Sequence, residues 1–205
     1  MPDVSPVPAR LRRGVAVVGA LVLLAGCSST EQQGPAQVVD QGYQSGDGSV
    51  RIWPADDRGE ALDLSGTTYD DAEVDLADWR GDVVVLNTWF AACPPCRAEA
   101  PLLVDIATQG EIDGVHVLGI NRTDDAGAAL AFERTYDMPY PSIDDRSGQA
   151  TSALEGVVPV QATPTTVVLD KQGRVAARVL GTLDASTITT IIDDVRAEPA
   201  AGSGA

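Results

Sequence analysis

Two cysteines separated by two prolines, Cys93-Pro94-Pro95-Cys96, carry the clearest chemical signal in this sequence. A cross-link over so short a loop adds little stability, because disulfide stabilisation through the unfolded chain grows with loop length. The spacing suits dithiol–disulfide exchange instead, in which one thiolate attacks a disulfide and a second thiol resolves the product. The two prolines remove two N–H groups and limit the backbone freedom between the cysteines. We therefore expect redox chemistry at this pair.

The surroundings of Cys93 predict which cysteine attacks. Cys93 stands between an apolar run, residues 83–89, and a stretch of helix-forming residues that starts at Pro94. Unpaired N–H groups and the helix dipole at such a start stabilise a thiolate, so the pKa of Cys93 should be lowered. Cys96, about one turn into the helix, is then expected to resolve the mixed disulfide.

Glu99 is a candidate proton acceptor. It lies three residues after Cys96 and shares its face if the segment is helical. A carboxylate there could take the proton of Cys96 during resolution. The alternative is a solvated acid in the first turns, favoured by the helix dipole, and the spacing alone does not choose between the two.

A metal site is not favoured. Structural zinc requires four ligands and catalytic zinc three, but besides Cys27 the sequence offers only Cys93, Cys96 and the single histidine, His116. A copper carrier should have a ligand histidine near its last hairpin, where this sequence has none. His116 lies within an apolar strand and is expected to be structural. We expect no metal and no cofactor other than the Cys93–Cys96 couple.

The elements that must position these residues alternate along the chain. The predicted strands are 83–89, 115–120, 142–144, 165–169 and 174–180, and the predicted helices are 94–109, 124–136, 148–154 and 184–196. A hairpin or extended lead-in is expected over 62–78. This order predicts an α/β fold with a central mixed sheet, helices on both faces and an N-terminal hairpin extension.

The start of the chain predicts export. Arg10, Arg12 and Arg13 precede an apolar run, residues 14–25, which has the length of a signal peptide. The run ends in Leu-Ala-Gly before Cys27, which resembles the bacterial lipobox. That resemblance implies a lipid on the Cys27 sulfur and an acylated amine, and two or three acyl chains anchor a protein stably. The alternative is an ordinary secretory signal with an incidental cysteine.

Composition divides the chain into four parts. We predict a signal peptide over 1–26, a flexible tether over 27–50, a folded domain over 51–197 and a disordered tail over 198–205. The formal net charge of −16 argues against nucleic acid as a partner.

The segment 83–101 resembles the TlpA/ResA branch of the thioredoxin superfamily, which consists of membrane-anchored thiol-disulfide oxidoreductases. The resemblance continues through Ala162-Thr163-Pro164 and the turn at 170–173, so it covers roughly 62–196. It implies a thioredoxin-like fold, a cis proline at Pro164 that faces the cysteine pair, and a peptide-binding backbone at Thr163.

The same resemblance bears on the other site residues. It implies that Pro94 and Pro95 lie at the substrate-binding surface and that Glu99 takes part in proton transfer. Asn87 stands where cytoplasmic thioredoxins usually have a buried aspartate, and Ala92 stands where many relatives have a tryptophan. Asparagine does not titrate, so a proton acceptor must be another residue.

The resulting hypothesis is a thiol-disulfide oxidoreductase on the outer face of the cell membrane, held by a lipid anchor. It would reduce protein substrates, by analogy apocytochrome c, and would receive electrons from a transmembrane thiol-reductant donor. An oxidase that introduces disulfides differs only in reduction potential. A non-enzymatic lipoprotein that uses the fold as a binding module is the third reading, and the intact Cys93, Cys96 and Thr163-Pro164 speak against it.

Overall fold

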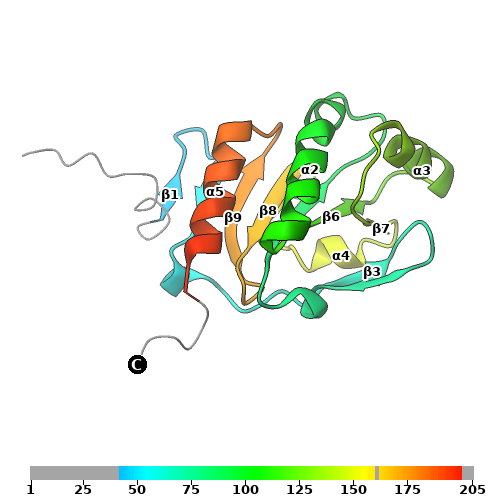
Figure 1. Cartoon of the computed structure of the whole chain (residues 1–205). Helices are drawn as coiled ribbons and strands as arrows, with labels where there is room; N and C mark the ends of the chain where they lie inside the picture. The colour runs from blue at the N-terminus through cyan, green and yellow to red at the C-terminus, as the bar shows by residue number, and fades with distance from the viewer. Residues whose placement is uncertain (1–41, 160–161, 200–205) are drawn as a thin grey trace, which may run out of the picture. The chain divides into compact units, whose positions relative to one another are not determined.

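One mixed sheet organises the computed structural model, which describes residues 42–159 and 162–199 (Figure 1). Within these residues the seven strands lie in the order β1-β2-β9-β8-β5-β6-β7. Their bounds are β1 Tyr43–Gln44, β2 Val50–Ile52, β5 Val83–Thr88, β6 Val115–Asn121, β7 Ser142–Asp144, β8 Thr165–Leu169 and β9 Val175–Leu180. β5, β6 and β7 are parallel, and the other four strands pair antiparallel. The predicted mixed sheet is confirmed.

The central strand β5 explains why its sequence is apolar without interruption. All six of its residues are buried, because both faces of the sheet are covered. Side chains alternate between the faces: Val83 and Val85 join one apolar core, and Val84 and Leu86 join the other. Asn87 continues the first series, so its side chain points to the face of Val83 and Val85.

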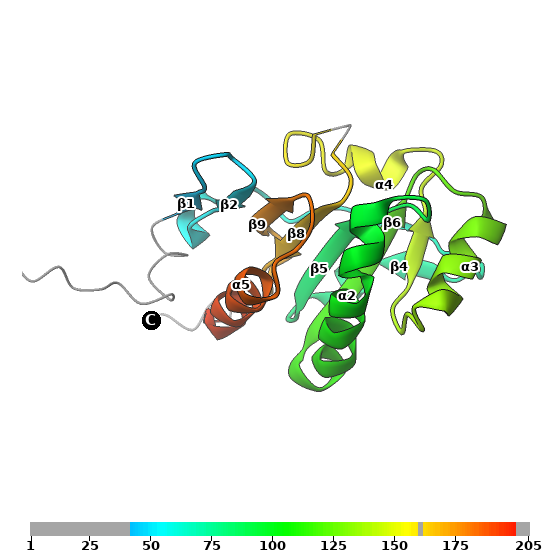
Figure 2. The same ribbon diagram turned by 90° about the horizontal axis from the view of Figure 1, so that it is seen from above.

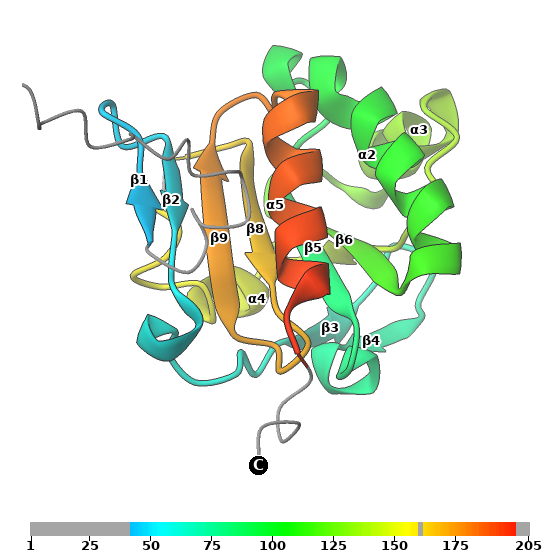
Figure 3. The same cartoon turned by 60° about the vertical axis from the view of Figure 1, so that its left-hand side comes forward.

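Helices cover both faces of the sheet (Figures 2 and 3). The longer helices α2, Pro94–Asp113, and α5, Ala185–Ala197, pack on the face of Val83 and Val85. The short helix α4, Gln149–Ser152, packs on the opposite face together with the hairpin of β3, Ser65–Thr67, and β4, Glu73–Asp75. The remaining α-helix of the described residues, α3, Ala126–Thr135, packs near the start of α2.

Helix α2 is longer than the predicted segment 94–109. It continues through Gly110 to Asp113 and ends at Gly114, which has the positive φ of 71° typical of a helix end. The helix continues through Gly110. A glycine is needed there because a residue without a side chain lets α2 approach β6 closely. A Cβ at residue 110 would lie 2.3 Å from the carbonyl oxygen of Val115.

The folded region also begins earlier than predicted. β1 lies inside the predicted tether and pairs with β2, with Tyr43 opposite Ile52. The polar residues between them form a turn, in which the Asp47 Oδ1 accepts hydrogen bonds from the Ser45 hydroxyl at 2.6 Å and the Ser49 N–H at 3.0 Å. A composition that resembled a linker therefore encodes a hairpin connection.

The predicted tail is wrong at its first residue. Arg58 donates from its two Nη atoms to the Glu198 carboxylate, each bond 2.6 Å long. The Lys171 Nζ donates to the main-chain carbonyl of Glu198 at 2.9 Å. Glu198 is therefore part of the fold.

Several predicted features lie outside the described residues: the signal peptide 1–26, the lipidated Cys27, most of the tether, and 200–205 of the tail. Among the residues that are described, no helix combines the length and apolar character needed to cross a membrane.

Candidate active site at the Cys93–Cys96 disulfide

Cys93 and Cys96 form a disulfide at the start of α2. Cys93 is the N-cap residue, and the N–H of Cys96 donates to its sulfur at 3.1 Å. Pro94 and Pro95 occupy the first helical positions, where a missing N–H is harmless, and both are exposed. The sequence therefore places the sulfur of Cys93 where helix N–H groups and the dipole favour negative charge.

An aromatic stack supports the disulfide from the side. Trp89 and Phe132 stack with ring centroids 4.5 Å apart, and both belong to the apolar cluster that includes the two cysteines. Gly119 makes room for the indole, because a Cβ at that position would lie 2.6 Å from the Trp89 Nε1. The glycine in this buried strand is thus explained by a close approach to the site.

The loop before Cys93 is held by a carboxylate from another segment. The Ala91 N–H donates to the Asp124 Oδ2 at 2.6 Å, and the fully buried Asn121 donates to the same oxygen at 2.8 Å. The Asn121 Oδ1 accepts from the N–H groups of Thr123 and Asp124, both at 3.0 Å. This role of Asp124 was not predicted from the sequence, although an asparagine at the end of a strand is typical of such a turn.

Glu99 is buried, with 2% of its surface exposed. Its Oε1 accepts from the Asn87 amide at 2.8 Å, and its Oε2 accepts from the Leu183 N–H at 3.1 Å. Burial raises the pKa of Glu99 to about 7, although these two hydrogen bonds act to lower it. The alternative of a solvated acid is therefore wrong, and Glu99 titrates near neutral pH.

Asn87 links Glu99 to the sheet. Besides its bond to Glu99, its amide nitrogen donates to the Thr166 hydroxyl at 3.0 Å. Thr166 lies opposite Asn87 in the β5–β8 pairing and is buried. Both amide hydrogens are thus used by neighbours on β8 and α2, and the carboxylate in this buried network belongs to Glu99, not to residue 87.

The peptide bond between Thr163 and Pro164 is cis, as the resemblance implied. Pro164 is buried and its carbonyl accepts from the Gly181 N–H at 2.9 Å, whereas Thr163 is exposed. Neither the N–H nor the carbonyl of Thr163 bonds to another described residue. This backbone segment therefore presents a free donor and a free acceptor.

His116 belongs to a different part of the molecule. Its Nε2 lies 2.9 Å from the Asp82 Oδ2, and its ring stacks on Trp79 at 4.8 Å. Over the described ranges, 42–159 and 162–199, no three side chains of the types His, Cys, Asp and Glu gather as metal ligands would.

Comparison with known proteins agrees with this geometry. The AhpC/TSA family model matches residues 58–178. The thiol-disulfide oxidoreductase ResA of Bacillus cereus is 28% identical over 141 residues, which cover 69% of this chain and 76% of the relative. The thiol:disulfide interchange protein DsbE of Pseudomonas aeruginosa is 34% identical over 125 residues, which cover 60% of this chain and 65% of the relative.

A solved structure extends the likeness to three dimensions. The secreted thiol-disulfide isomerase of Corynebacterium glutamicum superposes with a TM-score of 0.70 at 32% identity, covering 76% of this chain and 97% of that protein. The predicted thioredoxin-like fold is thereby confirmed. With this fold, a disulfide at the start of α2 and relatives that share thiol-disulfide chemistry, the chain is a thiol-disulfide oxidoreductase and belongs to the AhpC/TSA family.

Proposed function

We propose that this protein reduces disulfides of protein substrates outside the cytoplasm, with Cys93 as the nucleophile and Cys96 as the resolving thiol. The observation that carries the proposal is the disulfide at the N-terminus of α2, with a buried Glu99 of pKa about 7 three residues after Cys96 on the same helix. In the reduced protein the Cys96 N–H and the helix start stabilise the Cys93 thiolate.

Reduction proceeds in two exchanges. The Cys93 thiolate attacks one sulfur of the substrate disulfide, forming a mixed disulfide and releasing the other substrate sulfur as a thiolate. Glu99 then takes the proton of the Cys96 thiol, and the Cys96 thiolate attacks the Cys93 sulfur. The second substrate thiolate leaves, two electrons have passed to the substrate, and the Cys93–Cys96 disulfide remains. No further cofactor enters this scheme.

The substrate peptide is held beside the pair. Thr163 offers its free N–H and carbonyl to an extended chain, and Pro164 packs behind them. In this proposal Pro94 and Pro95, which are exposed, supply the other side of the binding surface. Because main-chain contacts dominate, such a site accepts many sequences and discriminates through neighbouring contacts.

The cellular setting of the proposal comes from the sequence. A lipid on Cys27 anchors the domain to the outer face of the cell membrane, and a transmembrane thiol donor reduces the Cys93–Cys96 disulfide again after each cycle. The TlpA/ResA resemblance supports apocytochrome c cysteines as the substrate. The related isomerase of C. glutamicum is a secreted protein, which supports a location beyond the cytoplasm.

Trapping tests this function. Cys96→Ala leaves the attacking thiol but removes the resolving one, so substrates and the donor should accumulate as mixed disulfides on Cys93. Cys93→Ala is the control and should trap nothing and lose disulfide-reductase activity in dithiothreitol. Equal activity of wild type and Cys93→Ala would refute the proposal.

Equilibration with glutathione tests the direction of transfer. A reductant should have a potential near that of thioredoxin, about −270 mV, because its dithiol form gives up electrons readily. A value near that of DsbA, about −120 mV, would instead favour the oxidase reading. The measurement requires only the folded domain and its two cysteines.

A further inference from the structure

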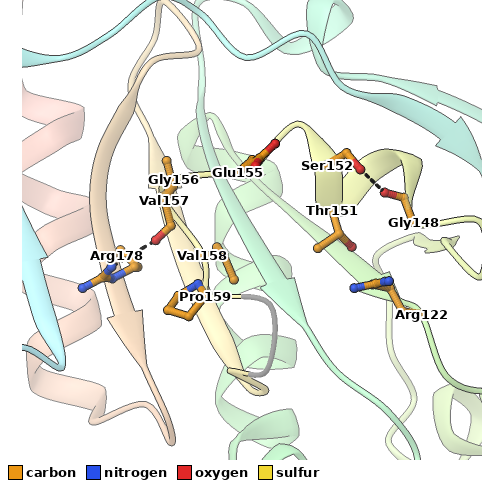
Figure 4. Close-up of a pocket in the computed structure, with 10 residues that line it drawn as sticks. All are labelled: Arg122, Gly148, Thr151, Ser152, Glu155, Gly156, Val157, Val158, Pro159 and Arg178. Carbon is orange, nitrogen blue, oxygen red and sulfur yellow. Dashed lines mark hydrogen bonds between the residues drawn. The ribbon is translucent and has the colours of Figure 1, made fainter.

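A cavity of about 530 Å³ opens beside the active site, between Arg122 after the end of β6 and Arg178 on β9 (Figure 4). We name it the arginine groove. Its wall includes Val157, Val158 and Pro159, which Figure 4 shows between the two arginines. The volume lies within the range of about 300–1,000 Å³ that is usual for binding sites.

The groove continues toward Thr163, the candidate peptide-binding residue. A smaller hollow is lined by Trp89 and Thr163 as well as by Arg122, Val158 and Pro159, which also line the groove. Trp89 packs in the cluster that contains both cysteines. A peptide bound at Thr163 can therefore extend directly into the arginine groove.

Arg122 is available for a ligand. It is exposed, and it has neither a hydrogen bond nor an ion pair with any other residue in the described part of the chain. Its guanidinium lies over Gly148, where a Cβ would approach its Nη2 to 3.3 Å. The glycine thus leaves room for the arginine at the mouth of the groove.

Arg178 adds a fixed positive charge. Its Nη1 donates to the Val157 carbonyl at 3.0 Å and its Nη2 to the Gly48 carbonyl at 3.1 Å, so its charge has no carboxylate partner in the described residues. Arg51 lies opposite it in the strand pairing, and burial together with the charge of Arg51 lowers the pKa of Arg178. Glu155 is the one carboxylate among the groove's described lining residues.

We infer that the arginine groove binds an acidic segment of the protein substrate, close in sequence to the cysteine that reacts with Cys93. The inference rests on the proposed function and adds a substrate class to it. The chain carries 30 acidic and 14 basic residues, so most of its surface repels such a segment. A local pair of arginines beside the active site then steers it to one place.

Model peptides can test the inference. Three N-acetylated peptides have one cysteine each, with two aspartates two residues before it, two aspartates two residues after it, or asparagines at both places. Each cysteine carries 5-thio-2-nitrobenzoate as a mixed disulfide. The Cys93 thiolate attacks the peptide sulfur and releases the coloured thionitrobenzoate, and Cys96 then displaces the peptide thiol. The release rate is measured with reduced protein and, as a reference for intrinsic reactivity, with dithiothreitol.

After this correction, wild type at low ionic strength should react with one of the aspartate peptides about fivefold faster than with the asparagine peptide, as expected for a charge-assisted contact. Arg122→Gln should abolish the preference and leave the asparagine rate unchanged. Arg134→Gln, an exposed arginine on α3 outside the groove, makes the same change in net charge and should keep the preference. Added salt should weaken it.

The outcomes separate the two proposals. If the peptides react but the aspartate preference is absent, or is equal in wild type and Arg122→Gln, the groove does not bind acidic segments and the proposed function stands. If no peptide reacts with the reduced wild type, the proposed function fails and the inference falls with it.

Discussion

Two buried carboxylates of this domain have opposite surroundings. Asp170, in the turn between β8 and β9, accepts from the Arg58 Nη1 at 3.0 Å and the Arg174 Nε at 2.8 Å. Among the described residues, Glu99 accepts only from the neutral Asn87 amide and one N–H group. Both side chains are almost fully buried. Asp170 is therefore paired with two arginines, whereas Glu99 has no cation partner among the described residues, and burial raises its pKa to about 7.

The difference shows how one fold separates two tasks. Burial alone would lower the pKa of Arg58, but Glu198 and Asp170 raise it overall, so this cation stays charged and ties three distant segments together. At Glu99 the absence of a cation among its described neighbours keeps the charged form costly. A carboxylate of that kind is suited to exchange a proton with Cys96.

The largest expected effect is the loss of stability when the ion pairs of Arg58 with Asp170 and Glu198 are broken. Arg58→Met leaves Glu198 without its partner and Asp170 with one arginine, so the free energy of unfolding should fall by about 3–5 kcal/mol. Urea titration measures it. Arg196→Met removes a partly exposed arginine with surface ion pairs to Asp113 and Asp193 and should cost less than about 1 kcal/mol. Equal losses of unfolding free energy in the two variants would mean that burial of the Arg58 ion pairs is unimportant.

The next effect concerns pH. The pKa of Glu99 is about 7 in the folded protein against an ordinary 4.5, so the folded state holds a proton that the unfolded state loses between these values. The contribution of Glu99 to stability should be largest below pH 4.5 and decline as the pH rises to 7, by about 3 kcal/mol in total.

Glu99→Gln should remove this decline, so the stability of the variant relative to wild type rises with pH. Urea titrations of the oxidised proteins across this pH range give the comparison. Glu60→Gln, the same change at an exposed position, should follow wild type. A wild-type curve parallel to that of Glu99→Gln would contradict the raised pKa.

A smaller effect is expected at Asn87. Asn87→Ala removes the bond that lowers the pKa of Glu99, so the pKa should move further above 7. The stability loss should be about 2 kcal/mol at alkaline pH, where the carboxylate is charged, and smaller at about pH 5. Nuclear magnetic resonance of labelled glutamate carboxyls measures the pKa directly. An unchanged or lower value would show that the amide does not stabilise the anion.

The smallest effect is expected at Thr166. Thr166→Val removes only its hydrogen bond with Asn87 and should cost about 1 kcal/mol. Because Thr166 does not bond to the carboxylate, this loss should be the same at about pH 5 and pH 8. A loss that varies with pH as in Asn87→Ala would show that Thr166 also stabilises the charged Glu99 carboxylate.

Local patterns were sufficient to predict much of the site. The apolar run of β5 and the C-x-x-C pair at its end fixed the position of Cys93, because strand burial and helix initiation depend on neighbours in sequence. The cis bond at Pro164 followed from the resemblance and not from the residues alone. The length of α2 was missed because Gly110 packs against β6, a contact that has no local signature.

The buried networks could not be predicted, because their partners are far apart in sequence. The Leu183 N–H that binds Glu99 is 84 residues away from it, and Glu198 is 140 residues from Arg58. Residue type and spacing indicated that Glu99 shares a face with Cys96. Whether that face was exposed to solvent or buried depended on β5 and the segment after β9, which only the fold brings together.

The central claim is that Glu99 accepts the proton of Cys96 during resolution, and the rate of that step tests it most directly. A mixed disulfide between Cys93 and a small thiol is prepared in wild type and in Glu99→Gln, and closure to the Cys93–Cys96 disulfide is followed from about pH 5 to pH 9. Wild type should speed up with an apparent pKa near 7, and Glu99→Gln should close more slowly and lack that inflection. Superimposable profiles would contradict the account.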